Sequence, residues 1–279
     1  IKKHRFKMKK TKKANILFSL VGLSLLLNSC KKEEEINPNQ VKEFSIHSNN
    51  TGSDYGIWVV LPKDYDSSLT YETIYVLDAN WWAPEKIAKY TEEKSAKYSK
   101  QNAIVVGINN NGNERNRDFT PTVTSNGDGD GGSENYSKFI EFELIKKIES
   151  DYPVDTTARS RVILGHSLGG LLTCFFFTKH PNVFNNYITL SASTWYDNDL
   201  LFQYETDTRA SNSAINNLVF IGCGDLEEWS VLRAQEWNYR LSTYYPNCKT
   251  GFNKLANRNH NESALANAEI GLDFYYKNK

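Results

Sequence analysis

The sequence lacks the closely spaced cysteines and histidines of common metal sites: neither a CxxC nor an HExxH pattern occurs in its 279 residues. Cysteine is rare, with 4 in the chain. Cys174 falls in an apolar helical stretch and Cys223 ends an apolar strand-like run, which favours buried free thiols over a disulfide. We therefore predict neither a metal nor another cofactor.

A net charge of either sign is also missing, because 33 Lys and Arg residues balance 33 Asp and Glu residues. No long-range field would draw such a chain to nucleic acid or to an anionic membrane. The longest apolar run, Ile16 to Leu27, is shorter than the roughly 20 residues that span a bilayer. Aromatic residues, by contrast, make up 13% of the chain, which suits aromatic-lined pockets.

The first thirty residues read as a targeting segment. Met8 is the only methionine, so we expect translation to begin there and residues 1–7 not to be translated. A lysine-rich start, the apolar run and the sequence "LNSC" ending at Cys30 resemble a bacterial lipoprotein signal, with Cys30 as the lipidated residue. The alternative is an ordinary cleaved signal with a chance cysteine.

Residues 31–40, "KKEEEINPNQ", are charged and then rich in Asn and Pro, which predicts a flexible tether. Their "KKEEE" resembles the acidic export signal of surface lipoproteins in the Bacteroidetes. We expect a protein anchored by lipid on Cys30 in the cell envelope of a Gram-negative bacterium, at the outer membrane. The sequence leaves open which side of that membrane it faces, although the export-signal resemblance favours the cell surface.

From Val41 to the end, strand-like and helix-like segments alternate, and no linker divides them. An initial hairpin followed by βαβ alternation predicts one α/β domain over residues 41–279 with a mostly parallel sheet and helices on both faces. Strands are expected at residues 42–48, 56–62, 73–78, 102–108, 161–166, 187–192, 217–223 and 250–256. Helices are expected at residues 84–100, 133–150, 168–180, 227–244 and 262–276.

The sequence "GHSLGG", residues 165–170, stands between a buried strand and an apolar helix. A G-x-S-x-G pattern in that setting predicts a nucleophile elbow, with Ser167 at the sharp turn and the Leu168 N–H as an oxyanion donor. The alternative is a glycine-rich turn that packs helix on sheet.

A serine nucleophile needs a base, and the chain has 5 histidines. His4 lies in the leader, His47 in the first strand, His166 inside the elbow pointing away from Ser167, and His180 at the far end of the helix. His260 remains, after the last strand, where the active face of such a sheet opens.

A carboxylate that orients the histidine is expected after the strand ending at Cys223. Asp225, Glu227 and Glu228 are all available there, and the residues alone do not choose among them. For each, the alternative is a helix N-terminal charge that favours the macrodipole. A second oxyanion donor is expected in the loop after residues 73–78, where Asn80 is the best candidate unless it only caps the next helix.

Several segments together resemble an esterase family of α/β-hydrolases that includes enterochelin esterases, feruloyl esterases and the antigen 85 acyltransferases. They are "YVLDANWW", "VVGINNNGNERNRDFTPT", "RVILGHSLGGLLTCFFFTKHP", "GCGDLEE" and "NRNHNES", in the order expected. The resemblance covers almost all of the chain after Val41 and is strongest to the enterochelin esterase-like branch. It implies the α/β-hydrolase fold.

The resemblance also assigns roles. The family's nucleophile falls on Ser167, its histidine on His260, and its acid on Glu227, with Asp225 as second choice. An Asp-Gly pair of the family is here Asp78-Ala79, a departure, and the donor position falls on Asn80.

Three further residues match segments near the active site of relatives. Arg115 and Arg117 are candidates for holding an anionic or catecholate substrate, although Arg117 with Asp118 equally fits a structural ion pair. Trp195 either lines an acyl or aryl pocket or caps the core.

These observations predict a serine esterase that hydrolyses a siderophore ester or a feruloyl or acetyl ester of a glycan through an acyl-enzyme. The alternatives are a surface lipoprotein that binds a glycan or siderophore without cleaving it, and an acyltransferase. Oligomeric state is left open.

Overall fold

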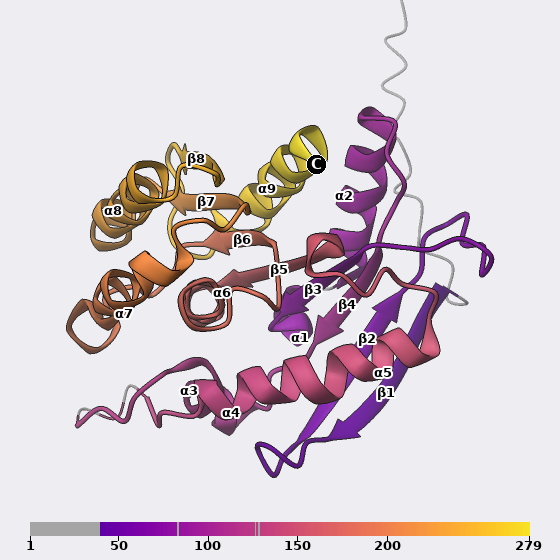
Figure 1. The fold of residues 1–279 in the computed structure, drawn as a ribbon, viewed down its shortest axis with the longest axis horizontal. Coiled ribbons are helices and arrows are strands. Elements are labelled where there is room, and N and C mark those ends of the chain that lie inside the picture. The colour runs from indigo at the N-terminus through magenta and orange to yellow at the C-terminus, as the bar shows by residue number, and fades with distance from the viewer. Residues whose placement is uncertain (1–39, 83, 126, 128) are drawn as a thin grey trace, which may run out of the picture. The chain divides into compact units, whose positions relative to one another are not determined.

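Figure 1 shows the computed structural model, which describes residues 40–279 apart from residues 83, 126 and 128. The chain divides into two units, residues 1–35 and 36–279, and every described residue belongs to the second. The predicted signal peptide, its Cys30 and residues 31–39 of the predicted tether lie outside the described residues. Within the described part of the chain, no helix has the length and apolar character needed to cross a membrane.

One sheet of eight strands forms the centre of the fold, in the order β1-β2-β4-β3-β5-β6-β7-β8. β2 pairs antiparallel with both β1 and β4, and all other neighbours are parallel. The predicted N-terminal hairpin and mostly parallel sheet are therefore confirmed. The strands are β1 (Val41–His47), β2 (Asp54–Val60), β3 (Thr73–Leu77), β4 (Ile104–Ile108), β5 (Arg161–His166), β6 (Asn186–Leu190), β7 (Leu218–Gly224) and β8 (Lys249–Leu255).

Helices cover both faces of the sheet (Figure 1). α2 and α9 pack together on one face, and α6, α8 and the long helical segment from residue 133 to residue 151 lie on the other. The helices are α1 (Ala79–Trp82), α2 (Pro84–Lys97), α3 (Arg115–Phe119), α4 (Ser133–Lys138), α5 (Ile145–Asp151), α6 (Leu168–Lys179), α7 (Tyr196–Asn212), α8 (Glu228–Tyr244) and α9 (Ala264–Asn278).

The central strands are apolar throughout because each is covered on both sides. In β3, Ile74 and Val76 join the core under α2 and α9, whereas Tyr75 and Leu77 join the core on the opposite face. Since successive side chains of a strand point to opposite faces, this alternation places apolar groups in two separate cores. The sheet is thereby held rigidly, and the ends of its strands form a fixed platform for the loops that follow them.

The segment from residue 133 to residue 151 is helical, as predicted, but contains a π-helical stretch at Phe139–Leu144. Tyr136, Ile140, Leu144 and Ile148 recur at helical spacing in this segment, and all four are buried. Hydrophobic spacing predicts which face of this helix is buried, but it does not predict the π-helical stretch.

α7 has no counterpart among the predicted elements. Of its side chains, only Tyr196, Leu201, Glu205 and Asn212 are buried, so it lacks the apolar stripe that marks an amphipathic helix. It also begins irregularly, with Asp197, Asn198 and Asp199 in left-handed backbone conformation. Buried polar contacts stabilise it instead, among them two hydrogen bonds from Arg209 to Glu205 (both 2.8 Å).

Candidate active site

Ser167 occupies the turn between β5 and α6 with φ 60° and ψ −121°, a conformation that costs a non-glycine residue free energy. Neighbouring backbone holds it there: the Ser167 N–H donates to the Leu190 carbonyl (3.0 Å), and its own carbonyl accepts from the Ser193 N–H (3.0 Å). A Cβ at Gly165 would lie 2.3 Å from the Gly169 carbonyl oxygen. The close crossing of strand and helix that presents the serine therefore requires glycine at position 165.

The Glu227 side chain sits just beyond β7 and is almost fully buried. Its Oε2 accepts a hydrogen bond from Nδ1 of His260 (2.7 Å), and its Oε1 accepts from the Gly224 N–H (2.7 Å) and from the hydroxyls of Ser191 (2.7 Å) and Ser263 (3.0 Å). Four donors thus fix one carboxylate, and the proton on Nδ1 leaves the other ring nitrogen of His260 free to accept.

These contacts also keep the carboxyl group ionised. Burial opposes ionisation, but the hydrogen bonds from His260, Gly224 and Ser191 outweigh it and lower the pKa of Glu227 to about 2. Glu227 is therefore a carboxylate at every pH at which the protein would work, suited to orienting an imidazole and to stabilising its positive charge.

The other two candidate acids lie elsewhere. The Asp225 Oδ1 accepts from the Arg258 N–H at 3.4 Å, so this side chain braces the loop that carries His260 from its outer side. Glu228 is exposed and begins α8. Of the three carboxylates that the sequence leaves open, the geometry brings Glu227 to the histidine.

The hydroxyl of Ser167 lies 3.4 Å from that of Ser193, and among the described residues it makes no hydrogen bond to His260. The two loops nevertheless meet, because the rings of His166 and His260 pack with centroids 4.4 Å apart. Serine–histidine hydrogen bonds are often long in free enzymes and tighten once substrate binds. The structure thus brings the loop of His260 to the turn that carries Ser167, and proton transfer between the two residues stays a prediction.

His166 is a site residue that sequence reasoning dismissed. Its side chain contacts the loop that carries His260: its Nε2–H donates to the His260 carbonyl at 2.9 Å. Trp82 covers its ring edge-on. The His166 side chain thus holds the backbone of the loop that carries His260. The signal in the sequence was a polar ring at the end of a mostly apolar strand.

This burial predicts a pH dependence of stability. Burial, together with the neighbouring His260, lowers the pKa of His166 from 6.5 to about 4. Below pH 6.5 the unfolded chain gains a proton that the folded chain takes up only near pH 4, so stability falls as pH drops through this window. The full difference corresponds to about 3 kcal/mol.

We expect His166→Gln, which has no titrating group, to lack this loss. The gap in the free energy of unfolding between wild type and variant should shrink as the pH falls from 7 to 4. Denaturant titrations at several pH values measure it, and parallel curves for the two proteins would contradict the assignment.

The loop after β3 holds Asn80, the residue predicted to be the second oxyanion donor. Asp78, not residue 79, is in the left-handed conformation (φ 56°), so Ala79 replaces the family's glycine without requiring a positive φ. The Asn80 amide binds Asn110: its Oδ1 accepts from the Asn110 N–H at 3.0 Å, and its Nδ2 donates to the Asn110 Oδ1 at 3.3 Å. On the other side of the site, Leu168 is the first residue of α6, where N–H groups have no partner within the helix.

The two arginines both have carboxylate partners. Arg115 is buried and donates from Nε and Nη2 to the two oxygens of Asp78 (2.7 and 2.8 Å), which clamps the loop before Asn80. Arg117 donates to Asp118 at 2.8 Å, the structural ion pair that the sequence left open. Contact of either guanidinium with substrate stays a prediction.

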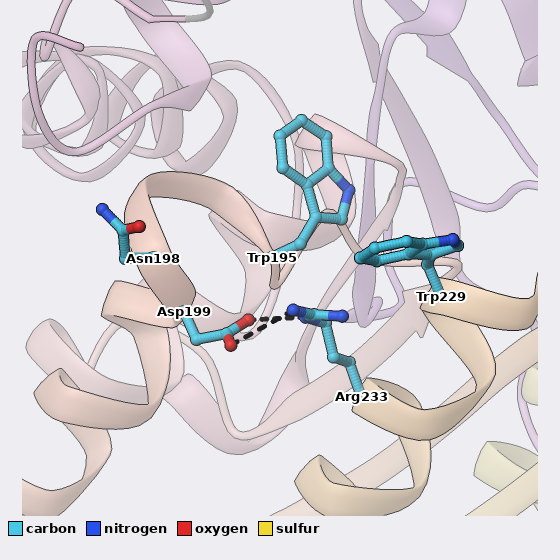
Figure 2. Close-up of a pocket in the computed structure, with 5 residues that line it drawn as sticks. All are labelled: Trp195, Asn198, Asp199, Trp229 and Arg233. Atoms are coloured by element: carbon cyan, nitrogen blue, oxygen red, sulfur yellow. Dashed lines mark hydrogen bonds and ion pairs between the residues drawn. The ribbon is translucent and has the colours of Figure 1, made fainter. Parts of the chain in front are cut away.

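Trp195 is 42% exposed and does not cap the core. Figure 2 shows it beside a pocket of about 490 Å³ that Asn198, Asp199, Trp229 and Arg233 also line. Sequence reasoning missed these four residues, and no motif marks them. Among the described residues, no group of three His, Cys, Asp or Glu side chains is placed to hold a metal ion.

The fold and the site together define an α/β-hydrolase. Residues 48–234 match the model of the family described as "Putative esterase". Ferri-bacillibactin esterase BesA of Bacillus subtilis is 31% identical over 203 residues, covering 65% of this chain and 68% of that protein. The chain belongs to this esterase family, whose members point to a carboxylic ester hydrolase acting on a small molecule.

Two other proteins are similar to this chain. The siderophore triacetylfusarinine C esterase of Aspergillus fumigatus is 26% identical over 160 residues, covering 53% of this chain and 54% of that protein. The crystal structure of the BES protein of Bacillus cereus superimposes with a TM-score of 0.77 at 28% identity, covering 88% of this chain and 98% of that one.

Proposed function

We propose that the protein is a serine esterase in which Ser167, His260 and Glu227 act as nucleophile, base and orienting acid. The hydrogen bond of 2.7 Å from His260 to the buried Glu227 carboxylate carries this proposal. This hydrogen bond holds the imidazole of His260, in the loop after β8, in the tautomer that a base for the serine on the strained turn needs.

In the first half of the reaction, Ser167 Oγ forms a bond to the ester carbonyl carbon while His260 Nε2 takes the hydroxyl proton. The Leu168 and Asn80 N–H groups donate to the resulting oxyanion, and each such donor contributes on the order of 10²-fold in rate. The tetrahedral intermediate then breaks its bond to the alcohol oxygen, which receives the proton from His260. An acyl-enzyme remains on Ser167.

Water completes the cycle. The water oxygen attacks the acyl carbon while His260 takes a proton from the water. The second tetrahedral intermediate then expels Ser167 Oγ, which regains the proton from His260. The carboxylic acid leaves. Glu227 stays ionised throughout and stabilises the imidazolium that forms twice.

We further propose a siderophore ester as the substrate. The names of two relatives, ferri-bacillibactin esterase and siderophore triacetylfusarinine C esterase, support this choice. So does the pocket with two exposed indoles beside the site, since siderophore esters with aryl groups would offer rings to stack on them. Purified protein should hydrolyse enterobactin faster than methyl ferulate or acetylated xylan, measured by chromatography of the products.

Labelling with a fluorophosphonate tests the chemistry without knowledge of the substrate. We expect one label per chain, located on Ser167 by peptide mass spectrometry, because only an activated serine reacts. A protein that binds esters without cleaving them would stay unlabelled. Adding alcohol acceptors during turnover distinguishes the two reactions: hydrolysis gives only the carboxylic acid, whereas acyl transfer gives a new ester of the added alcohol.

We also propose that Cys30 is lipidated and anchors the protein in the outer membrane. Expressed in a Gram-negative host, the full chain should incorporate a labelled fatty acid and sediment with membranes. Cys30→Ser should lose both properties while keeping its activity. Unlabelled wild-type protein in the soluble fraction would favour an ordinary cleaved signal.

A further inference from the structure

The segment Ser191–Ser193, directly after β6, contacts two members of the proposed catalytic site. The Ser191 hydroxyl donates to Glu227 Oε1 at 2.7 Å, whereas the Ser193 hydroxyl lies 3.4 Å from the hydroxyl of Ser167. The first contact helps to fix the carboxylate that orients the imidazole. The second involves the attacking oxygen itself, and the reaction steps proposed so far give it no role.

The backbone fixes the position of the Ser193 side chain. The Ser193 N–H donates to the Ser167 carbonyl (3.0 Å), and the Ser193 carbonyl accepts from the Tyr196 N–H (3.0 Å). Two residues earlier, Ser191 has φ 41°, a left-handed conformation that other contacts must hold, and its N–H donates to the Gly222 carbonyl at 2.7 Å. The Ser193 hydroxyl is therefore held beside Ser167 by the chain on both sides of it.

The Ser193 hydroxyl has few alternatives to this contact. Ser193 is only 3% exposed, and within the described part of the chain Ser167 Oγ is the one hydrogen-bond partner of its hydroxyl. A buried hydroxyl that donates to nothing costs about 1–3 kcal/mol. The proton of Ser193 therefore has the nucleophile as its available acceptor.

The direction of this hydrogen bond follows from the proposed reaction. A serine hydroxyl has one proton and two lone pairs. When Ser167 gives its proton to His260, it cannot also donate to Ser193, so Ser193 must be the donor. Its bond then occupies one lone pair of Ser167 Oγ. The other lone pair stays available for the ester carbonyl carbon, and the proton is directed to the imidazole.

We propose that Ser193 is a positioning residue for the nucleophile: its hydroxyl donates to Ser167 Oγ and fixes the rotation of the Ser167 hydroxyl toward His260. A donor also draws some electron density from the attacking oxygen, but a neutral hydrogen bond of 3.4 Å is weak. A misplacement of about 1 Å, by contrast, can cost about 10²-fold in rate. This inference rests on the proposed esterase function and adds a residue to the same site.

Ser193→Ala tests this role through the reactivity of Ser167. We expect the second-order rate of labelling by a fluorophosphonate to fall about 10-fold, because the nucleophile loses its fixed orientation. The value of kcat/KM for p-nitrophenyl acetate, which includes formation of the acyl-enzyme, should fall by a similar factor. The melting temperature should change by no more than about 2 °C. Timed labelling with mass spectrometry, initial rates and thermal melts measure the three quantities.

Thr194→Val is the matched control. Thr194 is the next residue of the same turn, it is buried, and its hydroxyl has no hydrogen-bond partner among the described residues. Valine has nearly the same shape, so this variant removes a neighbouring hydroxyl and keeps that of Ser193. It should be labelled at the wild-type rate. Ser193→Thr, which retains a hydroxyl at the position, should be labelled within about 3-fold of wild type.

The outcomes separate this role from the esterase function. Labelling of Ser193→Ala at the wild-type rate, or a slow rate that Thr194→Val shares, would overturn the positioning role while Ser167 remains the nucleophile. If a melt shows that Ser193→Ala is unfolded, Ser193→Cys takes its place, and its weakly donating thiol should give slow labelling as well. An unsubstituted protein that is not labelled at all would overturn the esterase mechanism and the role of Ser193 with it.

Discussion

Ser167→Ala is expected to lower kcat for p-nitrophenyl acetate by at least about 10⁴-fold, because no other group can form the acyl-enzyme. The residual rate would come from direct attack of water on the ester, with the oxyanion donors still stabilising the transition state. Within the described part of the chain, the hydroxyl makes one long contact, to Ser193 at 3.4 Å, so its removal should change the melting temperature by no more than about 2 °C. Stopped assays together with thermal melts measure both quantities.

Ser242→Ala is the matched control, since Ser242 is an exposed serine on α8 away from the site. It should retain full activity and stability. If Ser167→Ala hydrolyses p-nitrophenyl acetate at the rate of this control, the proposed nucleophile is wrong. A thermal melt would show whether Ser167→Ala is inactive because it is unfolded. In that case Ser167→Cys takes its place, and fluorophosphonate labelling is the readout.

The fold was predictable because its signals are local. Apolar runs such as Ile104–Ile108 and the Gly-rich turn at Ser167 report burial and chain reversal through residues adjacent in sequence. The order of hairpin and βαβ units then determines the sheet. α7 was not predictable in this way, because buried polar side chains such as Glu205 hold it in place of an apolar stripe.

The site residues likewise divide into those that local sequence signals predict and those that depend on contacts between distant segments. Ser167 and His260 follow from position at the ends of strands, but the selection of Glu227 over Asp225 depends on which side of a turn each carboxylate faces. Ser191 and Ser263, which donate to Glu227, are separated from it by long stretches of chain. Contacts of this kind arise only when distant loops are brought to the same edge of the sheet.

The turn itself explains the selection. A Cβ at Gly224 would lie 2.2 Å from the Arg258 carbonyl oxygen, so this glycine lets β7 approach the His260 loop closely. The chain then folds back, and the Gly224 N–H donates to the Glu227 side chain at 2.7 Å. The Asp225 side chain accepts instead from the Arg258 N–H, at 3.4 Å.

Glu227→Gln and Asp225→Asn form the pair of variants that tests this selection. In Glu227→Gln the amide oxygen can still accept from Gly224, Ser191 and Ser263, but the NH₂ group then faces His260 Nδ1. The imidazole must move its proton to Nε2, where it can no longer accept from Ser167. We expect kcat to fall about 10³- to 10⁴-fold with little change in KM, measured by steady-state hydrolysis.

The kcat of Asp225→Asn should stay within about 3-fold of wild type, because its contact to the Arg258 N–H survives in the amide.

The ionisation of Glu227 distinguishes the stabilities of the two variants. Its folded pKa of about 2 lies below the ordinary 4.5, so its contribution to stability is present above pH 4.5 and lost as the pH falls toward 2. Glu227→Gln should lack that acid-induced loss, and Asp225→Asn should keep it. If instead Asp225→Asn shows the large fall in kcat, the acid of the site is Asp225, and the hydrogen bond from His260 to Glu227 has only a structural role.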